Sequence, residues 1–240
     1  MEKLIQSELE TNLVLTRENL LKKLENLFKD KAVEAHVFGS MARQQADAFS
    51  DIDIWFTFKD EDFDEIYKKR FEYYANLGDV IHLCEAPQNA PINGVHTALL
   101  IRSQNGVISV TDIYLCPLST AYITDEGKKL FGVDLSVGTI GFNPKKVIVD
   151  KNYRIDFFIF FIFNTIKKIA RHESDPFDGV LREYEYLYKN YQISVDPLDN
   201  REHNFSALKQ IIRNIKKVAN EKQQETLNVI SDFIEKVETN

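Results

Sequence analysis

Two aspartates, Asp51 and Asp53, interrupt the stretch HVFGSMARQQADAFSDIDIWFTF, which covers residues 36–58 and ends as an apolar, strand-like run. In an extended strand, residues two apart point to the same face, so both carboxylates are expected on one side and the alternating apolar residues Ile52, Ile54, Phe56 and Phe58 on the other. Burying two unpaired like charges is strongly unfavourable, so the pair must be solvated, ion-paired or metal-bound. Because Mg²⁺ prefers a few carboxylates together with substrate phosphates, the pair predicts a magnesium site.

A glycine-serine pair, Gly39-Ser40, precedes these aspartates by ten residues. A glycine between a strand and a short helix lets the backbone approach a phosphate closely, and the serine hydroxyl and the following N–H groups attract an anion. Arg43 can place a guanidinium on the same phosphates; the alternative is a surface ion pair with Asp47 at i+4. The stretch therefore predicts a phosphate site and a metal site at one end of a sheet.

A third acid, Asp112, lies in GVISVTDIYLC, where the other residues are mostly apolar or β-branched. An acid there departs from the pattern of a structural strand. We expect it to hold a second cation and to accept a proton from an attacking hydroxyl. The alternative is an edge-strand acid that faces water.

The elements that position these residues follow from the spacing of apolar side chains. In the first part of the chain, helices are expected over 7–30, 41–47 and 60–77, and strands over 33–38, 51–58, 79–86, 96–103 and 106–116. A Gln-Asn-Gly turn joins the last two strands as a hairpin. The predicted class is α+β, with a mixed β-sheet and flanking helices.

The pattern changes near residue 150. Residues 152–170 are apolar nearly all round, which is typical of a buried helix, and amphipathic helices are expected near 177–191, 205–219 and 223–238. Antiparallel helices of this kind form an all-α bundle. We therefore expect two domains, 1–149 with the candidate site and 150–240 with the helical bundle.

Composition narrows the function classes. The chain has 240 residues, 44% of them hydrophobic and 28% charged, which is ordinary for a soluble globular protein. All of the formal net charge of −7 lies in residues 1–150, which disfavours long nucleic acids and suits metal ions or a cationic substrate. The first twenty residues do not resemble a secretion signal, and the longest apolar run is too short to cross a membrane. Two lone cysteines, Cys84 and Cys116, favour a reducing, cytoplasmic location.

Together, Gly39-Ser40, the Asp51-Ile52-Asp53-Ile54 run and Asp112 on a later strand resemble the nucleotidyltransferase superfamily related to DNA polymerase beta. Within it, GSMARQQADAFSDIDI is similar to the equivalent stretch of bacterial antibiotic nucleotidyltransferases that act on aminoglycosides and lincosamides. Those proteins also join a catalytic domain of this kind to a C-terminal helical domain. The resemblance covers about sixteen residues closely and the rest of the chain loosely.

The resemblance implies that Ser40 and Arg43, with Gly39 at the bend, contact the phosphates of the nucleotide. It also implies that Asp51 and Asp53 bind Mg²⁺, with Asp112 as third ligand, base or both. Some antibiotic transferases take their base from a glutamate elsewhere, so three acids of the helical part stay open as alternatives: Asp156, Glu183 and Glu185.

The expected reaction is transfer of a nucleoside monophosphate, AMP from ATP or another nucleotide from its triphosphate, to a hydroxyl of a small acceptor with two Mg²⁺ ions and release of pyrophosphate. The resemblance points to an antibiotic acceptor and hence to antibiotic resistance. Two alternatives remain: a nucleotidyltransferase that modifies a protein by AMPylation, as an antitoxin-like enzyme would, or a non-catalytic nucleotide-binding module. No membrane partner is expected, and the sequence predicts no oligomeric state.

Overall fold

The computed structural model describes residues 7–138, 150–191 and 204–239. Two compact units divide the chain, Met1–Val147 and Ile148–Asn240. The predicted boundary between residues 149 and 150 falls at the end of a stretch outside the described residues and stays a prediction.

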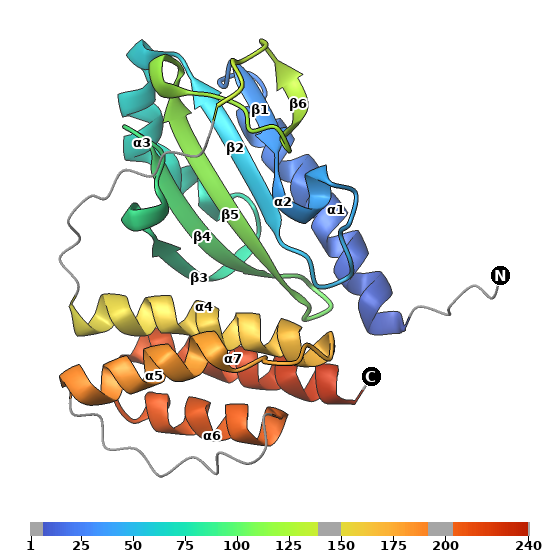
Figure 1. Ribbon diagram of the computed structural model, residues 1–240, viewed down its shortest axis with the longest axis vertical. Coiled ribbons are helices and arrows are strands. Elements are labelled where there is room, and N and C mark those ends of the chain that lie inside the picture. The colour runs from blue at the N-terminus through green and yellow to red at the C-terminus, as the bar shows by residue number, and fades with distance from the viewer. Residues whose placement is uncertain (1–6, 139–149, 192–203, 240) are drawn as a thin grey trace. The chain divides into compact units, whose positions relative to one another are not determined.

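Within its described residues, the first unit is built on a six-stranded mixed sheet with the order β3-β4-β5-β2-β1-β6 (Figure 1). β2 and β5 run parallel, and the other neighbouring strands run antiparallel. The strands are β1 (Glu34–Val37), β2 (Ile52–Phe58), β3 (Asp79–Glu85), β4 (Val95–Arg102), β5 (Ile108–Pro117) and β6 (Lys128–Gly132).

One face of this sheet packs against two helices, α1 (Glu8–Phe28) and α3 (Asp60–Ala75). The predicted alternation along β2 is confirmed on this face, where four apolar side chains are fully buried: Ile52, Ile54, Phe56 and Phe58. The ring centroids of Phe28 from α1 and Phe56 lie 4.7 Å apart. Full burial of each large apolar side chain contributes about 1.5–3 kcal/mol, so this layer anchors β2.

The start of α1 is fixed by a capping box. The Ser7 hydroxyl accepts a hydrogen bond from the amide of Glu10 at 3.2 Å, and the Ser7 amide donates to the Glu10 carboxylate at 3.0 Å. Both interactions satisfy backbone N–H groups that have no partner inside the helix. The helix therefore begins next to the predicted position, residue 7.

The second unit consists, over its described residues, of α4 (Lys151–Ala170), α5 (Asp178–Tyr191), α6 (Phe205–Lys216) and α7 (Glu221–Glu238). α4 contacts the other three helices, as its nearly continuous apolar surface predicts. Phe163 of α4 stacks on Phe233 of α7 with ring centroids 5.5 Å apart. The mixed sheet with flanking helices and the helical second unit confirm the predicted fold class. None of the helices in the described ranges is long and apolar enough to cross a membrane.

Two local predictions were wrong. The short helix expected over 41–47 is α2 (Gly39–Ala42), which begins at the glycine and stops early because Gln44 adopts a φ of +57°. β6 was not predicted, since its sequence KKLFG has little apolar alternation. It is a short edge strand with two lysines, a composition that protects a sheet edge from pairing with other chains.

Candidate active site

The chain turns sharply between β1 and α2 at Gly39, which adopts a φ of +66°. A larger residue would be strained at this angle. It would also collide with Asp53, because a Cβ at Gly39 would overlap Oδ2 and lie 3.3 Å from Cγ of that side chain. The amide of Phe38 donates to the carbonyl of Asp53 at 3.1 Å. The Asp53 carboxylate thus lies directly against the glycine bend.

The two other residues of the predicted phosphate site follow this bend. Ser40 is half-buried in α2. Arg43 is exposed, and its Nη1 lies 2.7 Å from Oε2 of Glu126 while its Nε donates to Gln45 at 3.2 Å. A phosphate at this position would compete with Glu126 for the guanidinium of Arg43.

The parallel pairing of β2 and β5 sets Asp53 and Asp112 side by side in register. Neighbouring strands lie about 4.8 Å apart, and residues in register point to the same face. That face is the one away from α1 and α3, because the alternate residues Ile54 and Ile113 point into the core. The structure therefore brings together two of the three predicted carboxylates, both half-buried.

Asp51 is half-buried at the entrance to β2. The guanidinium of Arg17 from α1 donates to the carbonyl of Asp47 in the preceding loop. Burial lowers the pKa of Arg17, whereas the charges of Asp47, Glu18 and Asp51 act in the opposite direction. A buried arginine of α1 thus anchors the loop that leads into Asp51.

Sequence reasoning missed one residue of this site, His96 of β4. Its Nε2 lies 2.7 Å from Oδ1 of Asp112, and the two side chains are 5% and 21% exposed. A carboxylate oxygen is a hydrogen-bond acceptor, so the tautomer with a proton on Nε2 donates a hydrogen bond to Asp112 at this distance. The available signal was a histidine in HTALLIRS, a strand that is otherwise nearly all apolar.

Aromatic rings form a stack next to the two carboxylates, on the same face of the sheet. The His96 ring lies parallel to Tyr114 with centroids 4.3 Å apart, Tyr114 stacks on Trp55 at 5.6 Å, and Trp55 stacks on His36 at 5.7 Å. Burial, followed by the charges of Asp112 and Asp53, raises the pKa of Tyr114 well above its ordinary value. The acidic pair therefore lies beside a continuous row of stacked rings on the same face of the sheet.

The ligand chemistry of the site fits Mg²⁺, because Asp51, Asp53 and Asp112 offer only carboxylate oxygens. Within the described ranges, no three His, Cys, Asp or Glu side chains already stand in the arrangement of a metal centre. The fit rests on donor type and on the shared face of Asp53 and Asp112. The assignment of all three carboxylates as metal ligands stays a prediction.

The alternative bases in the second unit have contacts within that unit. Asp156 accepts a hydrogen bond from the amide of Gln223 at 2.9 Å, and Glu183 lies 3.2 Å from Arg154. Glu185 pairs with Lys189 one turn along α5. Each of these acids thus has a polar partner within the helical bundle.

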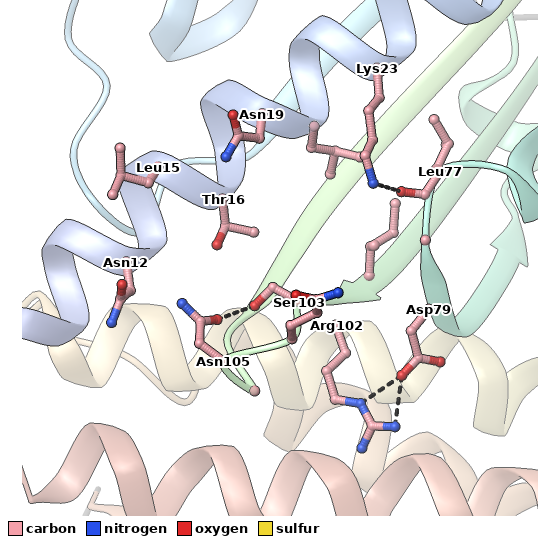
Figure 2. Close-up of a pocket in the computed structure, with 15 residues that line it drawn as sticks. Asn12, Leu15, Thr16, Asn19, Lys23, Leu77, Asp79, Arg102, Ser103 and Asn105 are labelled. Atoms are coloured by element: carbon pink, nitrogen blue, oxygen red, sulfur yellow. Dashed lines mark hydrogen bonds and ion pairs between the residues drawn. The ribbon is translucent and has the colours of Figure 1, made fainter.

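A large cavity of about 1150 Å³ lies elsewhere in the first unit (Figure 2). It is bounded by polar residues of α1, such as Asn12 and Asn19, by the start of β3 and by the turn between β4 and β5. Its apolar lining includes Ile101, which belongs to the core on the helix side of the sheet. None of the predicted site residues lines this cavity.

Comparison with protein families matches a segment of the first unit. Residues 22–98 match the family model described as Polymerase beta, Nucleotidyltransferase. The matched segment contains Gly39, Ser40, Arg43, Asp51 and Asp53 and ends before Asp112. No curated protein matches the sequence.

Among solved structures, the chain is similar to the CdnE cyclic dinucleotide synthase of Elizabethkingia meningoseptica, determined with GTP and Apcpp. The identity is 13%, the match covers 92% of this chain and 95% of that one, and the TM-score is 0.28. A likeness this loose carries no argument about function. Resemblance to the antibiotic transferases stays a prediction, whereas the family match to the segment with the glycine bend and both motif aspartates confirms the superfamily. Residues 22–98 thus match a nucleotidyltransferase domain of the polymerase beta superfamily.

Proposed function

We propose that this protein transfers a nucleoside monophosphate, AMP from ATP, to a hydroxyl group of a small acceptor and releases pyrophosphate. The observation that carries the proposal is the in-register pairing of Asp53 and Asp112, with the Asp53 carboxylate against the bend at Gly39. Two half-buried carboxylates on one face, beside a bend suited to phosphate, match the needs of phosphoryl chemistry, where positioning and charge neutralisation dominate.

In this reaction the acceptor oxygen forms a bond to the α-phosphorus while the bond from that phosphorus to the pyrophosphate oxygen breaks. Ser40 and Arg43 hold the phosphates, and Asp112 takes the proton that leaves the acceptor hydroxyl. Mg²⁺ held by Asp51, Asp53 and Asp112 would neutralise charge on the triphosphate and on the departing pyrophosphate. The Asp53 carboxylate lies where a side chain at Gly39 would otherwise be, so the glycine leaves space for it beside the bend.

A cationic or polar small molecule is the acceptor that best suits the chain. The negative charge of residues 1–150 would attract an aminoglycoside electrostatically, and a lincosamide fits the resemblance equally. Modification of a protein is the competing outcome, and the following experiment separates the two.

The test incubates the full chain with Mg²⁺, each of the four nucleoside triphosphates, and a panel of aminoglycosides and lincosamides. We expect pyrophosphate release with ATP and an acceptor product heavier by one AMP, both detected by mass spectrometry. Asp53→Asn and Asp112→Asn should each abolish turnover. Asp134→Asn, which changes an exposed carboxylate outside the site, is the matched control and should keep it.

The outcomes discriminate among the alternatives. Undiminished turnover by Asp53→Asn would contradict the mechanism. Labelled protein without a small-molecule product would assign the chain to the protein-modifying class. Nucleotide binding without transfer to any acceptor would indicate a non-catalytic module.

A further inference from the structure

His96 makes a single polar side-chain contact in the described part of the chain, and that contact is with Asp112. Its Nε2 lies 2.7 Å from Asp112 Oδ1, whereas its Nδ1 is buried and has no hydrogen-bond partner. Burying an imidazole with one nitrogen unpaired is unfavourable for folding. A histidine at this place is therefore poorly explained by the stability of the strand alone.

The imidazole ring of His96 packs against an aromatic ring of β5. Tyr114, the cross-strand neighbour of His96, stacks on it at 4.3 Å with only 7° between the ring planes. Tyr114 is in turn stacked on Trp55 at 6°. The stack restrains the plane of the imidazole, and the contact between Nε2 and Oδ1 directs that edge of the ring toward Asp112.

The consequence for Asp112 is a fixed carboxylate. The terminal torsion of an aspartate is broad, so an unrestrained carboxylate samples many orientations. A short hydrogen bond from the imidazole N–H to Oδ1 is charge-assisted and restricts that rotation. Oδ2 then remains for a cation and for the proton of the acceptor.

We propose that His96 is a positioning residue, which orients the Asp112 carboxylate through Oδ1 so that Oδ2 serves the reaction. The inference rests on the proposed function for its link to catalysis, but the effect on cation binding can be measured without any acceptor. Residues that orient metal ligands in this way typically change metal affinity by about 10- to 100-fold when they are replaced.

The structure offers two complementary substitutions. His96→Phe keeps an aromatic ring for the stack with Tyr114 and removes the N–H donor. His96→Gln removes the ring and keeps an N–H donor at similar reach. His82→Phe, the same change at a buried histidine of the neighbouring strand β3, is the matched control.

Binding of Mn²⁺ alone to the full chain is followed by electron paramagnetic resonance of free Mn²⁺. His96→Phe should raise the dissociation constant about 10-fold or more. His96→Gln should stay within about threefold of wild type, because it rescues the bond rather than the ring. His82→Phe should leave the dissociation constant unchanged, and urea unfolding verifies that each variant is folded.

A cycle with Asp112→Asn isolates the route of the effect. If His96 acts through Asp112, adding His96→Phe to Asp112→Asn changes Mn²⁺ binding less than twofold, since the oriented carboxylate is already gone. In turnover, the loss should fall on kcat rather than on the KM for the nucleotide.

Wild-type Mn²⁺ affinity in His96→Phe would overturn the inference. Equal losses of Mn²⁺ affinity in folded His96→Gln and His96→Phe would also overturn it. So would a double variant whose loss of Mn²⁺ affinity equals the product of the losses of His96→Phe and Asp112→Asn. A wild-type chain that binds Mn²⁺ but transfers no nucleotide contradicts the proposed function only, because the Mn²⁺ comparison still decides the role of His96.

Discussion

Replacement of Gly39 by alanine should destabilise the first unit in a way that depends on Asp53. Two separate effects contribute. The backbone at a φ of +66° strains any residue with a Cβ, by about 1–2 kcal/mol. The new methyl group also overlaps the Asp53 carboxylate, and such overpacking costs about 1–3 kcal/mol more. We expect Gly39→Ala to lower the free energy of unfolding by about 2–5 kcal/mol.

Removal of the carboxylate should relieve the second effect. In an Asp53→Ala background, Gly39→Ala should cost only the strain of about 1–2 kcal/mol, which leaves a coupling of about 1–3 kcal/mol between the two positions. Gly106→Ala is the control, because Gly106 has a similar φ of +74° in the turn between β4 and β5. It should cost the strain alone in either background.

Urea unfolding followed by tryptophan fluorescence measures these differences. The chain has one tryptophan, Trp55, which lies two residues from Asp53 on β2, so the signal reports on the first unit. An equal cost of Gly39→Ala with and without the Asp53 carboxylate would refute the reasoning. A cost no larger than that of Gly106→Ala would refute it as well.

Three further predictions concern other parts of the first unit. Glu126→Gln should lower the KM for the nucleotide by up to about fivefold at low salt, because Arg43 loses a competing partner in an exposed ion pair. Steady-state kinetics at two salt concentrations test this prediction, and an unchanged KM contradicts a phosphate role for Arg43. Burial raises the pKa of the Cys116 thiol from 9.0 to about 11, so at pH 8 its thiolate population should be about 100-fold below that of an ordinary cysteine. The contribution of the buried neutral thiol to the free energy of unfolding should be lost as the pH rises from 9 through 11. Slow labelling of the thiol by DTNB in native buffer and fast labelling in urea would support this prediction, whereas fast labelling in native buffer would contradict it. Glu34→Ala should lower the free energy of unfolding by about 1–3 kcal/mol for each buried group that it leaves without a partner, His36 and Thr57. Urea unfolding compared with Glu34→Gln, which keeps an acceptor, shows whether the loss is that of the buried network.

The sequence was sufficient to predict the fold class and the alternation of side chains along β2. In a strand, apolar side chains at alternate positions all point to one face, and that face must pack against the helices. The glycine bend was also readable, since a glycine before a short helix suits a positive φ. The extent of α2 was not, because Gln44 ends the helix in a conformation that local propensity does not favour.

The contacts that refine the site depend on strand pairing and lie beyond local patterns. His96 and Asp112 are sixteen residues apart in the chain. They meet only because β4 and β5 pair in a register that sets His96 opposite Tyr114. Arg43 meets Glu126 across 83 positions. A single sequence gives no register for such pairs, so neither contact could be predicted from periodicity.

The order of strands has a consequence for how the site can assemble during synthesis. β5 is inserted between β2 and β4, although it follows both in the chain, so the two halves of the sheet have no edge in common until it arrives. A nascent chain or fragment that ends between β4 and β5 holds Gly39 and Asp53 but lacks the strand that joins β2 to β4. Pairing of segments so distant in the chain is slow, so we expect the acidic pair to form late in folding.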